Sequence, residues 1–106
     1  MAVLQTTVWR IRPGKTPDFV ANIAAAKKIV TRLGAEARLL TQAVGTNAPC
    51  SIFIIQTADW KAFGDLQTKM AADSEWQGFF QKVVATNQNP AADLIGTGLS
   101  VEVPLG

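Results

Sequence analysis

The sequence contains no histidine and no tyrosine, and it has one cysteine among 106 residues. Without an imidazole, histidine-ligated metal sites, histidine-based triads and histidine general bases are all excluded. Cys50 cannot form an internal disulfide, and it follows Ala48 and Pro49 with no cationic neighbour to activate its thiol. We therefore predict no metal site, no cofactor and no catalytic cysteine.

Charge is also scarce, because only 17% of the residues are charged and 48% are hydrophobic, whereas about 25% charged residues is usual. A monomer of this size buries less than about 68–70% of its unfolded surface. This composition therefore predicts that a second subunit covers part of the surface. The basic residues give a net charge of +2 and are dispersed, so no nucleic-acid partner is expected.

We expect no secretory signal, since no basic region followed by an apolar region stands at residues 1–12. The most apolar block, residues 52–55, is too short to cross a bilayer. We expect a cytoplasmic protein without a membrane partner. The length predicts a single domain over residues 1–106.

Residues 3–12 are rich in β-branched side chains and predict a first strand, which the Pro-Gly pair at 13–14 ends. The hydroxyl of Thr16 is placed to cap a helix with Pro17 in its first turn. Apolar residues at helical spacing then continue to about Leu33. These signals predict a helix from residue 16 to about Leu33, ended by Gly34.

Two further strands are predicted over residues 37–44 and 51–57, joined by a turn at residues 45–49. The short turn indicates a hairpin. The unbroken apolar block in the second of these strands indicates burial on both faces, which is typical of a central strand.

Asp59 is placed to cap a second helix, and Asp73 or Ser74 to cap a further helical segment that carries Trp76 and Phe80 on an apolar face. Proline and polar residues then predict a loop.

That loop covers residues 86–93, and a last strand is expected at roughly 95–103. Gly96 and Gly98 lack the third glycine and the following helix of a phosphate-binding loop. They indicate a bulge or a close backbone contact at the rim of a barrel.

The order of elements is β-α-β-β-α-β, which predicts an α+β, ferredoxin-like domain with a four-stranded antiparallel sheet. The helices cover one face of such a sheet. Large apolar residues lie on both faces of the first and third predicted strands. The face without helices therefore needs a cover of its own.

The strand opening near residue 3 and the split second helix, Ala58 to Ala71 followed by Asp73 to Phe80, resemble the dimeric α/β-barrel superfamily. Its members include antibiotic-biosynthesis-monooxygenase-like, NIPSNAP-like and EthD-like domains, and the resemblance covers nearly the whole chain. It implies a homodimer in which two sheets pack face to face. It also implies a ligand cavity between sheet and helices.

Aromatic side chains are the first candidates for ligand binding. Trp9, Trp60 and Trp76 could approach one wall of the cavity, with Phe80 beside them, and indole rings can stack on a flat aromatic molecule. The alternative is that these rings are core residues, as most aromatic residues at helical or strand spacing are.

Arg38 and Gln42 are polar positions within a predicted strand. If their face lines the cavity, the arginine could bind a carboxylate or phenolate through two hydrogen bonds. We favour the alternative, in which such residues are solvated at a sheet edge or pair with Glu102 or Asp93 of another subunit. Asn22 reads as a surface amide.

Two functions remain open at this point. The first is a homodimer that binds a small apolar or aromatic molecule, which we favour because no residues form an acid-base pair. The second, implied by the resemblance, is a monooxygenase-like enzyme that needs no cofactor and acts on an electron-rich aromatic substrate. Relatives in that superfamily rely on histidine or tyrosine, which this chain lacks.

Overall fold

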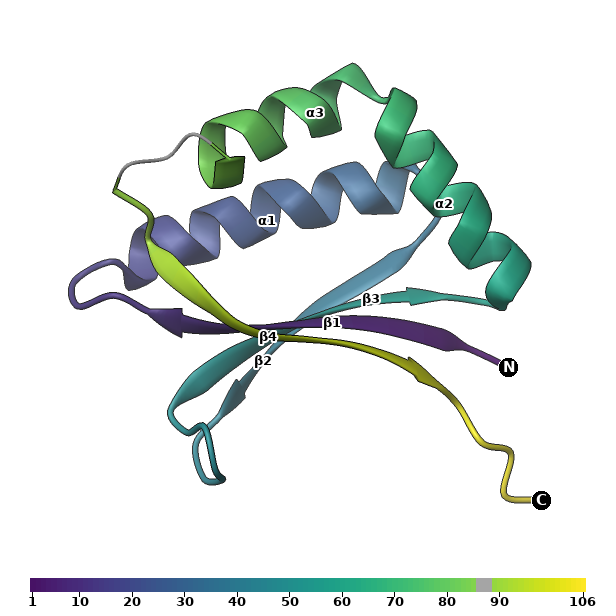
Figure 1. Cartoon of the computed structure of the whole chain (residues 1–106), viewed down its shortest axis with the longest axis horizontal. Helices are drawn as coiled ribbons and strands as arrows, with labels where there is room; N and C mark the ends of the chain where they lie inside the picture. Colours follow the sequence, from purple (N-terminus) through teal and green to yellow (C-terminus); the bar gives the residue numbers. More distant parts are fainter. Residues whose placement is uncertain (86–88) are drawn as a thin grey trace.

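The computed structural model describes residues 1–85 and 89–106, which form an α+β fold with one four-stranded sheet and its helices (Figure 1). The elements in chain order are β1 (Val3–Ile11), α1 (Thr16–Arg32), β2 (Glu36–Gln42), β3 (Cys50–Thr57), α2 (Trp60–Ala72), α3 (Ser74–Phe80), the π-helical turn η1 (Gln81–Ala85) and β4 (Ala92–Val101). The predicted fold class is confirmed.

The strands follow the order β2-β3-β1-β4, and every neighbouring pair is antiparallel. β3 is a central strand, as the apolar block predicted, and it forms the expected hairpin with β2. In the register of β1 and β3, Thr7 lies opposite Phe53 and Gln5 opposite Ile55. These four residues share one face of the sheet, because side chains alternate along a strand.

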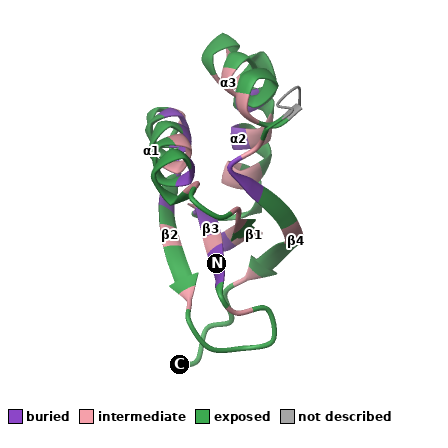
Figure 2. Ribbon diagram, turned by 90° about the vertical axis from the view of Figure 1, so that its left-hand side faces the viewer, coloured by how far each residue is buried: buried purple, intermediate pink, exposed green. Residues whose placement is uncertain are grey.

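All helices lie on that face (Figure 1). The core between them and the sheet holds buried residues of α1, α2 and β3, and buried segments concentrate on β3 while β2 and β4 are largely exposed (Figure 2). Its main cluster consists of Ala26, Val30, Ala35, Ala37, Phe53, Ile55, Leu66 and Met70. A second cluster of Phe19, Ala91 and Ala92 is linked to it by Trp9, Ile23 and Leu39.

The start of α1 differs from the prediction. Lys15 occupies the capping position and no side chain caps the helix, because Thr16 is already the first helical residue. Its hydroxyl therefore lies too late in the chain to accept from the first free amides. The other end agrees with the prediction, since the helix ends at Arg32 with Leu33 as its C-cap. Gly34 follows with a φ of 101°, in the region that glycine favours.

The split second helix is confirmed, and both caps are aspartates. Asp59 accepts a hydrogen bond from the backbone N–H of Ala62 at 2.8 Å, and Asp73 accepts one from that of Trp76 at 2.8 Å. The widening into η1 after Phe80 was not predicted.

Three strand boundaries differ from the prediction by two residues or more. β4 ends at Val101 rather than at 103. β2 ends at Gln42 rather than at 44. β4 begins at Ala92 rather than at 95, because Ala92 pairs with Ile11 and the carbonyl of Ala91 accepts from Arg12 N–H at 2.9 Å. Of the predicted loop at 86–93, residues 86–88 lie outside the described part and the last two belong to β4.

A bulge interrupts the pairing of β1 with β4, as the glycines predicted. The register shifts between Val8 and Trp9, so that Ile95 has no partner. Three residues on, a Cβ added at Gly98 would lie 2.9 Å from Thr6 Oγ1. Glycine therefore lets the two strands meet closely.

The opposite face of the sheet has no described helix on it, although Ile54 there is buried. It carries Leu4, Thr6 and Val8 of β1, Arg38, Leu40 and Gln42 of β2, and Ile52, Ile54 and Gln56 of β3. Leu40 is 47% exposed there. No described helix is long and apolar enough to pass through a membrane.

Candidate functional site

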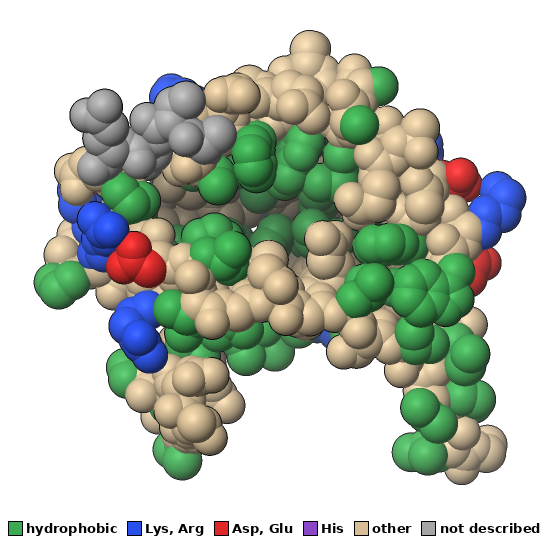
Figure 3. Space-filling model, viewed as in Figure 1, with side chains coloured by type: hydrophobic (Ala, Val, Ile, Leu, Met, Phe, Trp, Pro, Cys, Tyr) green, Lys and Arg blue, Asp and Glu red, His purple; other side chains and the backbone are tan. Residues whose placement is uncertain are grey.

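A cavity of about 430 Å³ lies between the sheet, α1 and the α3–η1 segment. Its floor comes from β1 and β3, with Trp9 and Phe53, and one wall from α1, with Phe19 and Ile23. It opens to solvent on the side where β4 passes below α3, and hydrophobic side chains line the hollow (Figure 3). The volume is within the range of about 300–1,000 Å³ that is typical of ligand pockets.

Aromatic rings stand on two sides of this space. Trp9 projects from the sheet with Phe19 beside it, at 6.1 Å between ring centroids. Trp76 and Phe79 of α3 form a second pair, at 5.6 Å and an interplanar angle of 31°. A flat molecule in the cavity would therefore meet aromatic faces from the sheet and from the helix above it.

The mouth of the cavity is an exposed apolar rim. Phe80 is 42% exposed, Val84 44% and Leu94 51%, and all three line the cavity. Exposed apolar side chains around an opening are typical of a ligand-binding groove.

Polar groups are few and lie at defined places. Thr7 Oγ1 accepts a hydrogen bond from Trp9 Nε1 at 2.8 Å, which fixes the indole ring. Gln5 Oε1 accepts from Gln67 Nε2 of α2 at 3.4 Å, which leaves the Gln5 amide nitrogen without a partner among the described residues. The floor thus offers one hydroxyl and one amide to a bound molecule.

Asp93 is the only ionisable residue on the lining within the described part of the chain. The Arg12 guanidinium donates to both of its carboxylate oxygens, at 2.8 and 3.2 Å. That hydrogen bonding holds the pKa of Asp93 below its usual value. A carboxylate so stabilised is a weak base, so none of the described lining residues is suited to accept a proton near neutral pH.

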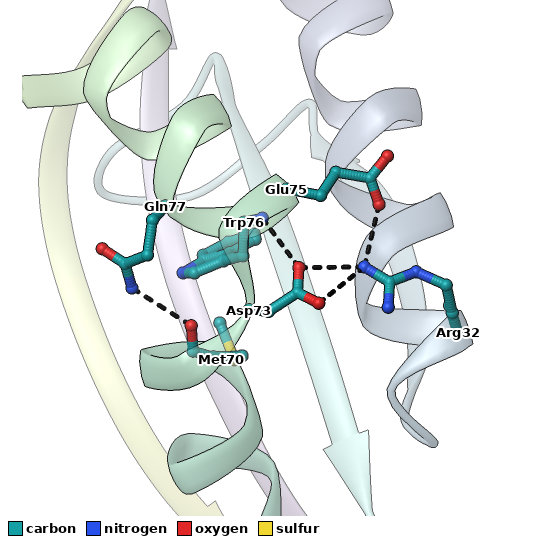
Figure 4. A network of polar contacts seen from close by, with 6 residues as sticks. All are labelled: Arg32, Met70, Asp73, Glu75, Trp76 and Gln77. Atoms are coloured by element: carbon teal, nitrogen blue, oxygen red, sulfur yellow. Dashed lines mark hydrogen bonds and ion pairs between the residues drawn. The ribbon is translucent and has the colours of Figure 1, made fainter.

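The position of Trp76 depends on a polar cluster at the junction of α2 and α3 (Figure 4). Arg32 Nη2, at the end of α1, donates to both oxygens of Asp73 at 2.9 Å and to Glu75 Oε1 at 2.8 Å. Asp73 in turn caps α3, and Gln77 Nε2 donates to the carbonyl of Met70. The cluster ties the first turn of α3 to both neighbouring helices.

The sequence-predicted site residues divide into two groups. Trp9, Trp76 and Phe80 line the cavity. Trp60 is 53% exposed and packs edge-on against Phe63, away from the lining.

Arg38 and Gln42 also lie away from the cavity, on the open face of the sheet. Arg38 Nη1 donates to Gln56 Oε1 at 3.1 Å, and Gln42 accepts from the Cys50 thiol at 3.2 Å. Asp93, which was one expected partner for such residues from another subunit, forms an ion pair with Arg12 of its own chain.

Sequence reasoning missed Gln5, Thr7 and Asn22. Gln5 and Thr7 lie on the same face of β1 as Trp9, because alternate residues of a strand share a face. Once Trp9 is assigned to the cavity, these two residues follow. Asn22 follows the apolar Phe19 by nearly one helical turn and lines the cavity instead of the surface. Among the described residues, no cluster of three acidic or cysteine side chains could hold a metal ion.

No family model and no curated protein matches this sequence. Among solved structures, the chain is similar to a NIPSNAP domain protein from Burkholderia xenovorans, with a TM-score of 0.68, 23% identity, and 98% of this chain and 97% of that chain covered. It is similar to SnoaB, a cofactor-independent oxygenase from Streptomyces nogalater, with a TM-score of 0.67, 15% identity, and 98% and 96% covered.

A third similar structure is a NIPSNAP family protein of unknown function from Agrobacterium tumefaciens, with a TM-score of 0.65, 13% identity, and 97% of this chain and 87% of that chain covered. These likenesses confirm, for the fold, the resemblance that the order of elements predicted.

Proposed function

We propose that the chain binds a small, flat, apolar or aromatic molecule in the cavity between the sheet and α3. The observation that carries the proposal is the pair of aromatic faces, Trp9 below and Trp76 above, around a space of about 430 Å³. Offset or edge-on aromatic contacts stabilise such a ligand beyond the burial of its area, by about 0.5–1.5 kcal/mol for each pair.

Binding without catalysis is favoured by the chemistry of the lining. A general acid or base must have a pKa near the working pH, and Asp93, the ionisable residue present, is held in an ion pair by Arg12. Gln5 and Thr7 can orient a hydroxyl or carbonyl group of the ligand but cannot take its proton.

The tryptophans supply a direct test with an internal control. N-phenyl-1-naphthylamine, a neutral aromatic molecule whose fluorescence rises in apolar surroundings, is titrated into the protein. We expect Trp76→Leu and Phe80→Ala to weaken its affinity, the first by about tenfold. Trp60→Leu should leave it unchanged, because Trp60 lies outside the cavity.

Equal affinities for Trp76→Leu and Trp60→Leu would place the dye elsewhere and reject the proposal. Both variants must unfold cooperatively, so that dye bound to loosened protein is not mistaken for dye in the cavity. Failure of the unaltered protein to bind would reject the proposal as well.

A second candidate is oxygenation of an electron-rich aromatic substrate without a cofactor, which the shared fold with SnoaB favours. In an anthrone, a CH₂ group and O₂ would give a C=O group and water, with O₂ as the oxidant. The substrate would have to ionise by itself, since the described lining residues include no suitable base. Oxygen consumption with a panel of anthrones, lost in Trp76→Leu, would establish this activity; no turnover would exclude it for them.

We propose further that the single domain works as a homodimer in the cytoplasm. The open face of the sheet supports the dimer, because Leu40 is 47% exposed there and Leu4 and Val8 are only partly buried. A second copy placed on this face would leave the mouth of the cavity, on the other face, open to ligand.

A further inference from the structure

A polar depression of about 260 Å³ adjoins the apolar cavity at the end where α1 begins. The two spaces share Asn22 and Ala91 on their linings. Its other walls are Lys15, Asp18, Ala21 and Asn89. A molecule that fills the cavity can therefore extend past Asn22 into surroundings of opposite character.

Lys15 is the cation of this depression. Its side chain is 34% exposed, and its ammonium lies 3.8 Å from Asp18 Oδ2. That separation is at the outer limit of an ion pair, and the Asp18 side chain is 66% exposed. A pair so long and so hydrated holds the ammonium weakly, so Lys15 can turn to a stronger acceptor.

Asn22 stands at the boundary between the two spaces. It is half-buried, and its side-chain amide has no hydrogen-bond partner among the described residues. An amide placed between an apolar space and a cation can donate to an anionic oxygen that reaches past it.

Two arginines, Arg10 and Arg12, lie at the same end of the molecule as this depression. Arg12 follows β1 at the same end of the molecule, but both of its bonds go to Asp93. Figure 3 shows Lys and Arg side chains gathered at the left-hand edge of this face, with an acidic side chain between them. Arg10 pairs with Asp93 in the register of β1 and β4 and is not on the lining of the depression, where Lys15 is the cation among the described residues.

We propose that the ligand of the cavity is an amphiphile, with a flat apolar body between Trp9 and Trp76 and an anionic group, such as a carboxylate or sulfonate, bound by Lys15 and Asn22. This inference rests on the proposed function, and it adds the polarity of the ligand and the residues that recognise its charged end. The anion replaces Asp18 as the partner of Lys15.

Two dyes that differ by one sulfonate test this directly: neutral N-phenyl-1-naphthylamine and its 8-sulfonate. We expect Lys15→Gln to weaken binding of the sulfonate about threefold to tenfold, which is the range of an exposed charge-assisted contact. Binding of the neutral dye should not change. Lys15→Arg keeps the charge and should restore the sulfonate affinity, and Lys28→Gln, on the exposed part of the same helix, is the control.

Asp18→Asn gives an effect of the opposite sign. Removal of the carboxylate leaves Lys15 without its present partner, so the sulfonate should bind more tightly than to the unaltered protein. Added salt should lower the sulfonate affinity of the unaltered protein and leave that of the Lys15→Gln protein nearly constant.

The outcomes distinguish failure of the anionic-group proposal from failure of the proposed function itself. If both dyes bind and Lys15→Gln changes them equally or not at all, the anionic end is rejected while the aromatic cavity stands. If neither dye binds the unaltered protein, the proposed function fails and this inference fails with it.

Discussion

Arg32 Nη2 lies 2.9 Å from both carboxylate oxygens of Asp73, although the two residues are 41 positions apart in the chain. Asp73 also caps α3. One carboxylate therefore connects the end of α1 to α3, the helix that carries Trp76. This connection helps to set the position of α3 over the cavity.

Replacing Arg32 with glutamine should weaken the attachment of α3 to α1. The Asp73 cap remains, but α3 loses its tie to α1, so local opening at Trp76 should become about threefold more frequent. Amide hydrogen exchange at Trp76 measures this, with Lys28→Gln as the matched control on the same helix. Unchanged exchange at Trp76 would mean that packing of Trp76 and Phe79 alone holds α3 in place.

Stability should fall in acid through Asp73 and Asp93. The hydrogen bond from the Trp76 amide, together with that from Arg32, lowers the pKa of Asp73, and Arg12 lowers the pKa of Asp93. The folded state thus binds these protons less tightly than the unfolded state, whose aspartates titrate near 3.9. Their contribution is complete above about pH 4 and is lost as the pH falls through the lower, folded pKa values.

Urea midpoints between about pH 6 and pH 2 measure this effect. Asp73→Asn keeps a capping side chain but should reduce the decline in acid. Between about pH 5 and pH 7 the midpoint should stay constant, because the chain has no histidine. If the urea midpoint of Asp73→Asn falls in acid as steeply as that of the unaltered protein, Asp73 does not contribute to the acid sensitivity.

Gly98 and Gly96 should differ in their tolerance of alanine. A Cβ at Gly98 would lie 2.9 Å from Thr6 Oγ1, whereas one at Gly96 would meet Val8 at 3.7 Å, an ordinary contact. Gly98→Ala should therefore lower the free energy of unfolding by about 1 kcal/mol, and Gly96→Ala should not. Adding Thr6→Ala to Gly98→Ala should recover the loss; two additive effects in that double variant would contradict the steric explanation.

Oligomeric state should respond to a charge on the open face of the sheet. We expect light scattering to give twice the chain mass of 11.3 kDa for the unaltered protein and the chain mass for Val8→Lys, because the dimer would bury an unpaired ammonium. Thr68→Lys, on the exposed side of α2, should leave the dimer intact. A stable monomer of the unaltered protein at micromolar concentration would refute the proposed pairing.

Local signals in the sequence predicted much of this fold. The sequence predicts Asp59 as one cap, and Asp73 or Ser74 as the next, because a cap depends on the few residues that follow it. The central position of β3 followed from its unbroken apolar block. The start of β4 was misplaced because the pairing of Ala92 with Ile11 joins residues far apart in the chain, and no local pattern records it.

The candidate site was harder to predict. The alternation of a strand separates two faces but does not show which face packs against the helices. The sequence therefore allows Arg38 and Gln42 to line the cavity, whereas the structure places them on the opposite face of the sheet. Asn22 reads as a surface amide in any helical pattern. Its place on the lining depends on the empty space beside it, which arises where α1 and α3 pack over the sheet.

The cavity and the main core share a wall, because Ala26, Phe53, Ile55 and Met70 belong to both. A molecule that enters the cavity therefore packs against the side chains that hold the protein folded. Because it binds the folded chain and not the unfolded one, a ligand at a hundred times its dissociation constant adds about 2.7 kcal/mol to the free energy of unfolding. The melting temperature of the protein is thus itself an assay with which an unidentified ligand can be found among candidate metabolites.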